Sequence, residues 1–598
     1  MKANQEQSVA ISAVPSRHEQ AARWGGDVLC LFALSLLLIV SWIPRYRGPI
    51  DLRWDAGVYY ILGTSLAESK GYRLLNEPGE IRAIQYPPGL PAIIAAEEMV
   101  LRTNQPAVVG MWLRHSWVVL SFLYVLFAFL LGRQFLSRRY SFLLAAACLL
   151  NYEMYFVSTL AFAELPFAVS STAFGYFYFK KNQGALTRLA APFAAVASYL
   201  LRSVGIALLL AWIADAVLRK HYRQAVVRAA VALVPVLLWQ SYIRSVESSD
   251  LYKHPYYAYQ RDPSMFYNVS YAANVSLKSP FQPEQGLANG RDLLVRFIGN
   301  FVEMPRTVGE AVSAKKGFGE GHVARVNRWI HPLALPSWSF QIVLVYLGLI
   351  VFAGIAWQIR RWDWFIPVYL LLTIAAICTT TWIDQFPRYL APVEPFLLIV
   401  FFSFLLNIKR TSGRWPVRVR RVTSILTVST ALFIVCESAL SCIVGYRNFR
   451  NKAIYVDAKG VEREYTLFHY PTEASASQAG MEWLVAHADP NAIVAVSMPQ
   501  WVYLKTGLKT VMPPLEPDWA KAQRLIDSVP ASYAVLDQLL MEDDFNRSFP
   551  GLVRGSPHKW RLVYLSPHRE FDIYQRIGLN STEKQVLPGS TRGRSLRF

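Results

Sequence analysis

Long apolar stretches recur along the first three quarters of this 598-residue chain, and they limit most strongly what it can fold into. Each has few charged residues, and a helix of about 20 such residues crosses the ~30 Å hydrocarbon core of a bilayer. A composition that is 53% hydrophobic also argues against several soluble domains. We therefore predict a mainly α-helical, polytopic membrane protein. About eleven stretches qualify as spans: residues 27–43, 112–132, 141–158, 162–179, 189–201, 204–218, 226–243, 338–357, 364–382, 391–407 and 423–445.

The basic residues support this assignment, because cytoplasmic loops of membrane proteins are rich in Lys and Arg. With a cytoplasmic N-terminus, alternate connections should carry the basic runs. They do, at Arg133, Arg138 and Arg139; Lys180, Lys181 and Arg188; Arg219, Lys220, Arg223 and Arg228; Arg360 and Arg361; and Lys409, Arg410, Arg414, Arg418, Arg420 and Arg421. The net charge of +20 therefore serves orientation in a membrane, and we expect no nucleic-acid partner.

This topology divides the chain into a membrane region, two large outer loops, a further domain and two tails. The predicted parts are a cytoplasmic tail at 1–26, a transmembrane region at 27–445 with outer loops at 44–111 and 244–337, an extracytoplasmic α/β domain at 446–577, and a flexible tail at 578–598.

After residue 446 the apolar runs shorten and alternate in the way that is typical of strands and helices. We expect strands beginning near 493, 533, 560 and 571, and helices near 475–488 and 519–528.

The first outer loop holds two short segments with helical character. Apolar residues from Val58 to Leu66 recur at helical spacing, and residues 90–101 form a second apolar helix begun by Pro91. Neither is long enough to span a bilayer, so both are expected to lie along the membrane surface.

Charged residues gather at the outer ends of several predicted spans. Asp51 and Asp55 follow the first span, Glu164 begins another, Arg202 lies between two, and Arg388 precedes another. Charged side chains at or within a membrane span cost free energy, and those that are present usually have a function. These residues are therefore candidates for one functional site. A carboxylate can act as a general base on a hydroxyl, and an arginine can bind a phosphate through two hydrogen bonds.

Simpler explanations exist for each of these residues. Asp55 could cap the helix that begins near Ala56, and Asp51 could be a solvated acid at the interface. Glu164 and Arg202 could pair with neighbouring helices for stability alone, and Arg388 could extend to lipid headgroups.

Several motifs resemble those of membrane glycosyltransferases of the GT-C fold, notably bacterial proteins similar to protein O-mannosyltransferases and to the aminoarabinose transferase of lipid A. The first-loop pattern is Asp55-x-x-x-Tyr59, then LGTSLAESKGYR, then Tyr86-Pro87-Pro88-Gly89-Leu90-Pro91. The segments AELPF around Glu164, RSVGIALLL from Arg202 and RYLAPVEPFLL from Arg388 also recur in such proteins.

The resemblance implies that Asp55 is the general base and that the donor is a sugar on a polyprenyl phosphate, attacked with inversion. Asp51 is the second choice for this role. Family members carry a Lys before the Pro-Pro pair that can meet the donor phosphate, where this chain has Gln85 and Tyr86. Arg202 or Arg388 is therefore expected to bind the phosphate instead. Tyr59, Gln85, Tyr86 and Glu164 complete the expected substrate site.

The function expected from these features is sugar transfer at the outer face of a membrane, most simply a bacterial inner membrane, to a lipid, glycan or protein acceptor. Membrane lipids are further partners. The sequence points to no cofactor and does not decide whether a divalent cation is needed. A lipid or sugar transporter, or a non-catalytic protein of envelope assembly, would also place charges within a helical bundle.

Overall fold

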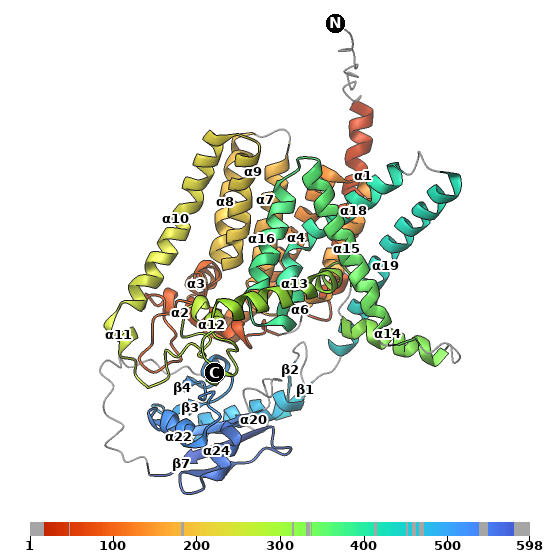
Figure 1. Ribbon diagram of the computed structural model, residues 1–598. Helices are drawn as coiled ribbons and strands as arrows, with labels where there is room; N and C mark the ends of the chain where they lie inside the picture. The colour runs from red at the N-terminus through yellow and green to blue at the C-terminus, as the bar shows by residue number, and fades with distance from the viewer. Residues whose placement is uncertain are drawn as a thin grey trace.

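The computed structural model contains a helical bundle and a smaller sheet-containing unit below one of its ends (Figure 1). The structure describes residues 17–46, 48–180, 184–313, 316–329, 335–336, 338–411, 416–449, 453–456, 462–465, 472–537 and 548–578. Most of the predicted tails, residues 1–16 and 579–598, lie outside the described residues.

Eleven described helices correspond in position to the predicted spans. They are α1 (Arg17–Trp42), α4 (Pro106–Phe135), α5 (Arg138–Leu150), α7 (Glu164–Phe179), α8 (Ala185–Leu201), α9 (Ile206–Leu218), α10 (Tyr222–Glu247), α15 (Ser339–Arg360), α16 (Phe365–Cys378), α18 (Glu394–Thr411) and α19 (Val417–Phe449). Among the described residues, six segments are long and apolar enough to cross a membrane: 25–42, 106–135, 222–247, 339–360, 383–411 and 425–444. The protein is thus helical and multi-pass, whereas the count of eleven spans remains a prediction.

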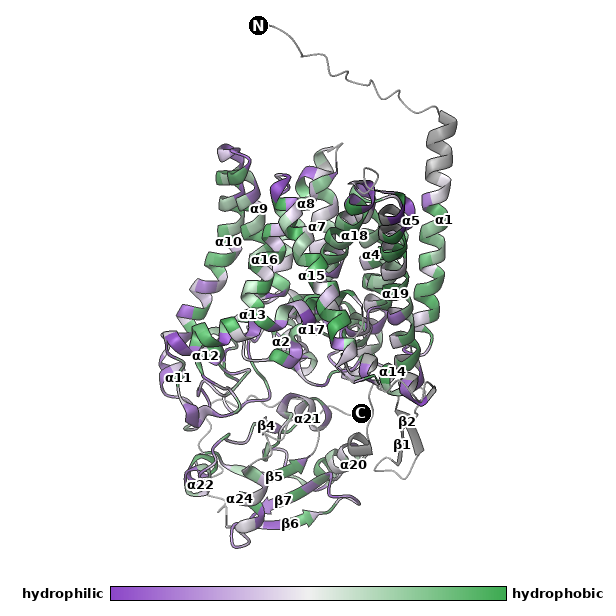
Figure 2. Ribbon diagram, turned by 45° about the vertical axis from the view of Figure 1, so that its right-hand side comes forward, coloured by the Kyte–Doolittle hydropathy of each residue, from purple (hydrophilic) through white to green (hydrophobic). Residues whose placement is uncertain are grey.

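Most of the length of the bundle helices is made of hydrophobic residues, as expected for helices in a bilayer (Figure 2). Large apolar side chains are exposed on α1, α10 and α19, including Phe32 (59%), Leu238 (68%) and Leu432 (61%). Such exposure would be unfavourable in water, so it supports insertion of these helices in a bilayer.

Both large loops emerge at the same end of the bundle, which we call the loop side (Figure 1). We call the opposite end, where the basic connections lie, the arginine side. The loop-side elements are α2 (Asp55–Ala67), α3 (Gly89–Leu101), α11 (Asp250–Lys253), α12 (Tyr271–Ser276), η2 (Pro283–Gln285), α13 (Gly290–Val312) and α14 (Lys316–Trp329). Short helices at the loop-side ends of the bundle are α6 (Tyr152–Val157), η1 (Ser203–Gly205), η3 (Ile383–Gln385), α17 (Phe386–Leu390) and η4 (Ala391–Val393).

The helices α2 and α3 occur where the apolar spacing predicted them, but their surroundings differ. Met99 and Val100 on α3 are 60% and 81% exposed, which suits a helix at a membrane surface. On α2, by contrast, every residue from 56 to 65 is buried. Protein therefore encloses α2, while its expected position along the membrane surface stays a prediction.

The C-terminal unit contains a five-stranded mixed sheet in the order β4-β3-β5-β7-β6. Strand β3 runs parallel to β4 and β5, while β7 runs antiparallel to β5 and β6. The expected strands and helices are present, and β1, β2, β4, α21 and α24 are additions. The elements are β3 (Ile493–Ala495), β4 (Lys509–Val511), β5 (Ala531–Asp537), β6 (Trp560–Tyr564), β7 (Phe571–Arg576), α20 (Thr472–His487), α21 (Pro499–Thr506), α22 (Trp519–Asp527) and α24 (Phe549–Gly555), preceded by the antiparallel pair β1 (Ala453–Val456) and β2 (Glu462–Tyr465).

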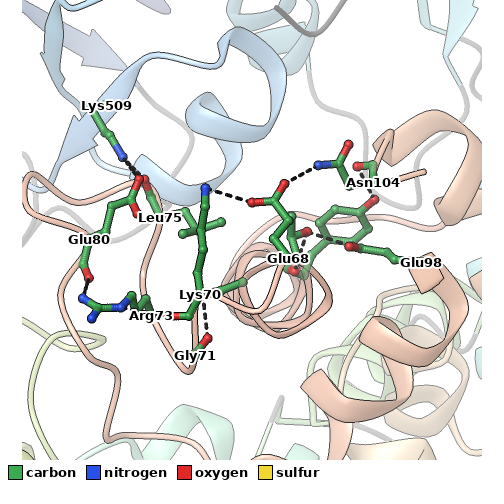
Figure 3. Close-up of polar contacts among 12 residues, drawn as sticks. Glu68, Lys70, Gly71, Arg73, Leu75, Glu80, Glu98, Asn104 and Lys509 are labelled. Atoms are coloured by element: carbon green, nitrogen blue, oxygen red, sulfur yellow. Dashed lines mark hydrogen bonds and ion pairs between the residues drawn. The ribbon is translucent and has the colours of Figure 1, made fainter. Parts of the chain in front are cut away.

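The C-terminal unit binds the first loop through β4 (Figure 3). Lys509 donates to the carboxylate of Glu80 at 2.9 Å and to the carbonyl oxygen of Leu75 at 2.5 Å. The backbone amide of Thr510 donates to the carbonyl oxygen of Asn76 at 2.8 Å. These bonds fix the sheet beneath the loop that leads from α2 to α3.

Candidate active site

The first turn of α2 begins in an unusual backbone conformation. Trp54, the residue before the helix, has φ 54° and ψ −134°, which costs a non-glycine residue about 1–3 kcal/mol. The indole packs against Phe156, and the Arg53 guanidinium lies 4.7 Å from its ring centre. Such strain persists where the surroundings impose it, and here it precedes the aspartate that the sequence singles out.

Asp55 is the first helical residue of α2, and its side chain makes no cap. The alternative that Asp55 serves as a helix cap is therefore wrong. Its Oδ2 accepts from Arg388 on α17 at 2.8 Å, and its Oδ1 accepts from the Tyr267 hydroxyl at 3.2 Å. Both oxygens thus bind donors from distant parts of the chain.

Glu164 links the two arginines. It begins α7, its side chain is fully buried, and its Oε1 accepts from Arg388 and from Arg202 at 2.5 Å each. Arg202 has an extended backbone at the break between α8 and η1, which lets its side chain reach α7. Extension of Arg388 to lipid headgroups is ruled out as its main role, because its guanidinium binds two carboxylates and is 16% exposed.

Together these four side chains form a cluster of two acids and two bases, which we call the ion cluster. Burial lowers the pKa of Arg202, but the neighbouring groups, chiefly the charge of Glu164, together raise it above its usual value, so this guanidinium stays charged. Asp55, Arg388 and Arg202 each retain 16–19% exposure, whereas Glu164 has none. Glu164 therefore holds the two arginines from within the protein, while Asp55, Arg202 and Arg388 remain partly accessible to solvent or substrate.

Tyrosines surround the Asp55 end of the ion cluster. Tyr59 lies one turn along α2, and its ring centre is 4.7 Å from that of Tyr86. Tyr86 in turn lies 6.2 Å from Tyr267. Sequence reasoning singled out Tyr59 and Tyr86 but not Tyr267, although the run of tyrosines in HPYYAYQRDPSMFYNVSY was a visible signal.

The Pro-Pro-Gly turn contributes shape rather than charge. Gln85 is buried, and its amide donates to the Asn274 side chain at 3.0 Å. A Cβ on Gly89 would lie only 2.6 Å from the carbonyl oxygen of Leu200. Glycine thus allows this turn to pack against the end of α8, two residues before Arg202.

Asp51 lies outside the ion cluster. It is 3% exposed and binds Arg53, with an oxygen-to-nitrogen distance of 2.7 Å. Its backbone bonds to residues 159 and 161, just before α7. The suggestion that it is a solvated interfacial acid is wrong, because both the carboxylate and its partner are buried.

Solved structures similar to this chain cover most of its length. The archaeal oligosaccharyltransferase AglB from Archaeoglobus fulgidus, in complex with an inhibitory peptide and a dolichol-phosphate, is 13% identical, with a TM-score of 0.52, over 94% of this chain and 76% of that chain. The Archaeoglobus fulgidus oligosaccharyltransferase tethered to an acceptor peptide is 12% identical, with a TM-score of 0.51, over 93% and 75%.

A third similar structure is ArnT from Cupriavidus metallidurans bound to undecaprenyl phosphate, which is 11% identical, with a TM-score of 0.49, over 92% of this chain and 98% of that chain. No protein-family model and no curated protein matches the chain. At these identities the likeness concerns the fold alone, and it confirms the GT-C fold expected from the sequence.

Proposed function

We propose that this protein is a membrane glycosyltransferase that transfers a sugar from a polyprenyl-phosphate donor to an envelope lipid, glycan or protein. The observation that carries this proposal is the ion cluster, which joins Asp55, Glu164, Arg202 and Arg388 from separate helices. The GT-C fold supports this proposal, because a similar solved structure is an oligosaccharyltransferase in complex with a dolichol-phosphate.

In the proposed reaction Asp55 acts as the general base. An acceptor hydroxyl replaces the Tyr267 hydroxyl at Oδ1 and gives its proton to the carboxylate. The acceptor oxygen then forms a bond to the anomeric carbon from the face opposite the phosphate, while the bond from that carbon to the phosphate oxygen breaks. The configuration inverts, and the lipid phosphate leaves with the electron pair.

The arginines would bind the donor phosphate. Each guanidinium has five N–H donors, and Glu164 uses only part of them. The remaining donors of Arg202 and Arg388 can bind phosphate oxygens and stabilise the charge that develops on the leaving group. Because Arg388 also binds Asp55, it would hold the phosphate close to the base.

The neighbouring side chains would shape the substrate site. Tyr59 and Tyr86 offer aromatic faces against which the C–H groups of a sugar can pack. Gln85 would hold the Pro-Pro-Gly turn in place rather than bind substrate, since its amide already donates to Asn274. Asp51 would position the segment that leads into Asp55 rather than touch substrate.

We also propose that the loop side is extracytoplasmic and that the N-terminus is cytoplasmic, in a bacterial inner membrane. The basic runs at the opposite end of the bundle support this orientation. Single cysteines at exposed positions, such as Leu251 on the loop side and Arg223 on the arginine side, should be labelled from opposite sides of sealed vesicles.

The test is sugar transfer by membranes whose polyprenyl-phosphate sugars carry a radioactive label. Membranes with the wild-type protein should transfer label to an acceptor, while Asp55→Asn and Arg202→Ala at equal protein levels should not. A matched control is Asp250→Asn, an exposed loop-side aspartate outside the ion cluster, which should transfer normally. Full transfer by Asp55→Asn would overturn the mechanism, and labelled lipid crossing vesicles without transfer would indicate a transporter.

A further inference from the structure

A polar pocket lies on the arginine side, at the opposite end of the bundle from Asp55. It has a volume of about 250 Å³, far above the ~10–15 Å³ that one water needs. Its walls come from the ends of α4, α7, α15 and α18, the start of α16, and the residue after α9. The ion cluster plays no part in it.

The pocket has an excess of positive charge. Its lining includes Arg219, Arg361 and Arg410 against one acid, Asp363. Arg219 also binds Asp215 behind it at 2.9 Å, and the Arg361 guanidinium lies 5.1 Å from the ring centre of Trp357. Three arginines around one cavity suit a bound phosphate.

Two further features of the pocket point to a ligand. Gln358 lines it and is only 5% exposed, yet its Oε1 has no hydrogen-bond partner among the described residues. A buried amide oxygen left without a partner costs about 1–3 kcal/mol. In addition, Phe365 and Ile366 bring the first turn of α16 to the pocket, and no side chain caps that turn. Helix N-termini favour anions.

We propose that this pocket binds the headgroup of an anionic glycerophospholipid from the membrane leaflet on the arginine side. The phosphate would lie between the arginines and the N-terminus of α16, and a headgroup hydroxyl would donate to Gln358. A lipid is favoured over free phosphate because the pocket lies at the ends of apolar helices, and Phe135 in its wall is 38% exposed. Orientation in the membrane alone would explain the arginines but neither the cavity nor the buried amide.

The test uses the purified full chain and native mass spectrometry with phosphatidylglycerol or phosphatidylcholine. The wild-type protein should retain phosphatidylglycerol at least roughly tenfold more strongly, and Arg361→Gln/Arg410→Gln should lose this preference. Gln358→Leu should weaken it by roughly three- to tenfold, because it removes one buried acceptor. The matched control Arg223→Gln changes an exposed arginine on the same side outside the pocket, and it should bind as the wild type does.

Four results would overturn the proposal. They are equal retention of the two lipids, an unchanged preference in the double variant, an equal loss in Arg223→Gln, and displacement of the lipid by millimolar inorganic phosphate. If the double variant misfolds, Arg361→Lys/Arg410→Lys keeps both charges but loses the paired geometry of guanidinium. Weaker binding by this folded variant supports the site, and wild-type binding argues against it.

Discussion

Asp51 and Asp55 are four residues apart, and the structure uses them in opposite ways. Asp51 binds Arg53, two residues along the chain, and both side chains are at most 4% exposed. Asp55 binds Arg388, 333 residues away, and both side chains remain 16–19% exposed. The first pair organises a backbone turn, whereas the second joins two distant helices at an accessible site. Proximity in sequence therefore says little about which acid can meet a substrate.

The largest effect on stability is expected at the Asp51–Arg53 pair. Asp51→Asn removes the Asp51 carboxylate from the buried Arg53 guanidinium, and breaking such a buried pair should cost roughly 3–5 kcal/mol. The thermal unfolding midpoint of the protein in detergent should fall clearly. The double variant Asp51→Asn/Arg53→Met should recover much of the loss, because both buried charges of the pair are then removed together. An unchanged midpoint in the single variant would contradict the contrast between the two aspartates.

A third carboxylate, Glu98 on α3, extends the comparison to an acid that has no ion pair among the described residues. Thr64 donates to its Oε1 at 2.7 Å, and burial raises its pKa to about 8. An unfolded glutamate has a pKa near 4.3, so the folded state holds an extra proton between about pH 4.3 and 8. The contribution of protonated Glu98 to the free energy of unfolding is therefore complete below about pH 4.3, and it is lost as the pH rises through 8.

Glu98→Gln should therefore make the free energy of unfolding less dependent on pH in this range. At pH 9 the variant should be more stable than the wild type by about 1–3 kcal/mol, since it avoids an ionised buried group. Melting curves from pH 5 to 9 measure the difference, with Asp250→Asn, a change of an exposed loop-side carboxylate, as control. Parallel profiles for wild type and Glu98→Gln would show that Glu98 is not the responsible group.

Asp55→Asn should lower stability by only about 1 kcal/mol, because its pair is more exposed than the Asp51 pair and an amide can still accept from Arg388. Its rate of sugar transfer should nevertheless fall roughly 10²- to 10⁴-fold. Stability and initial rate are measured on the same preparation. A large loss of stability with little loss of rate would reverse the roles assigned to the two aspartates.

Tyr267→Phe should have the smallest effect on sugar transfer. It removes one hydrogen bond to Asp55, so stability should fall by about 0.5–1.5 kcal/mol and transfer by roughly two- to tenfold. The decisive measurement is the ratio of the rates of Tyr267→Phe and Asp55→Asn. If both variants lose activity equally, Tyr267 does more than orient the carboxylate.

The sequence predicted the bundle well because a bilayer imposes strong rules on length and charge. The same rules assigned Asp55, Glu164, Arg202 and Arg388 to one boundary, and the structure brings them into contact. They could not predict the fate of Asp51, which depends on a turn held by backbone bonds to residues 159 and 161.

Two other features, the role of Tyr267 and the strand β4, could not be predicted from the sequence pattern either. Tyr267 belongs to an irregular loop, where no periodicity tells which of many tyrosines points inward. Strand β4 has three residues, too few for a recognisable alternation, although it carries the Lys509 contact to the first loop.

The long separation between Asp55 and Arg388 also has a consequence for biosynthesis. At ~5–20 residues per second, ribosomes need roughly 15–70 s to add the 333 positions between them. Throughout that interval Asp55 lacks its arginine partner, whereas Glu164 can pair with Arg202 once both have been added. A chain released before residue 388 therefore carries Asp55 near the bilayer without the arginine that pairs with it in the finished protein.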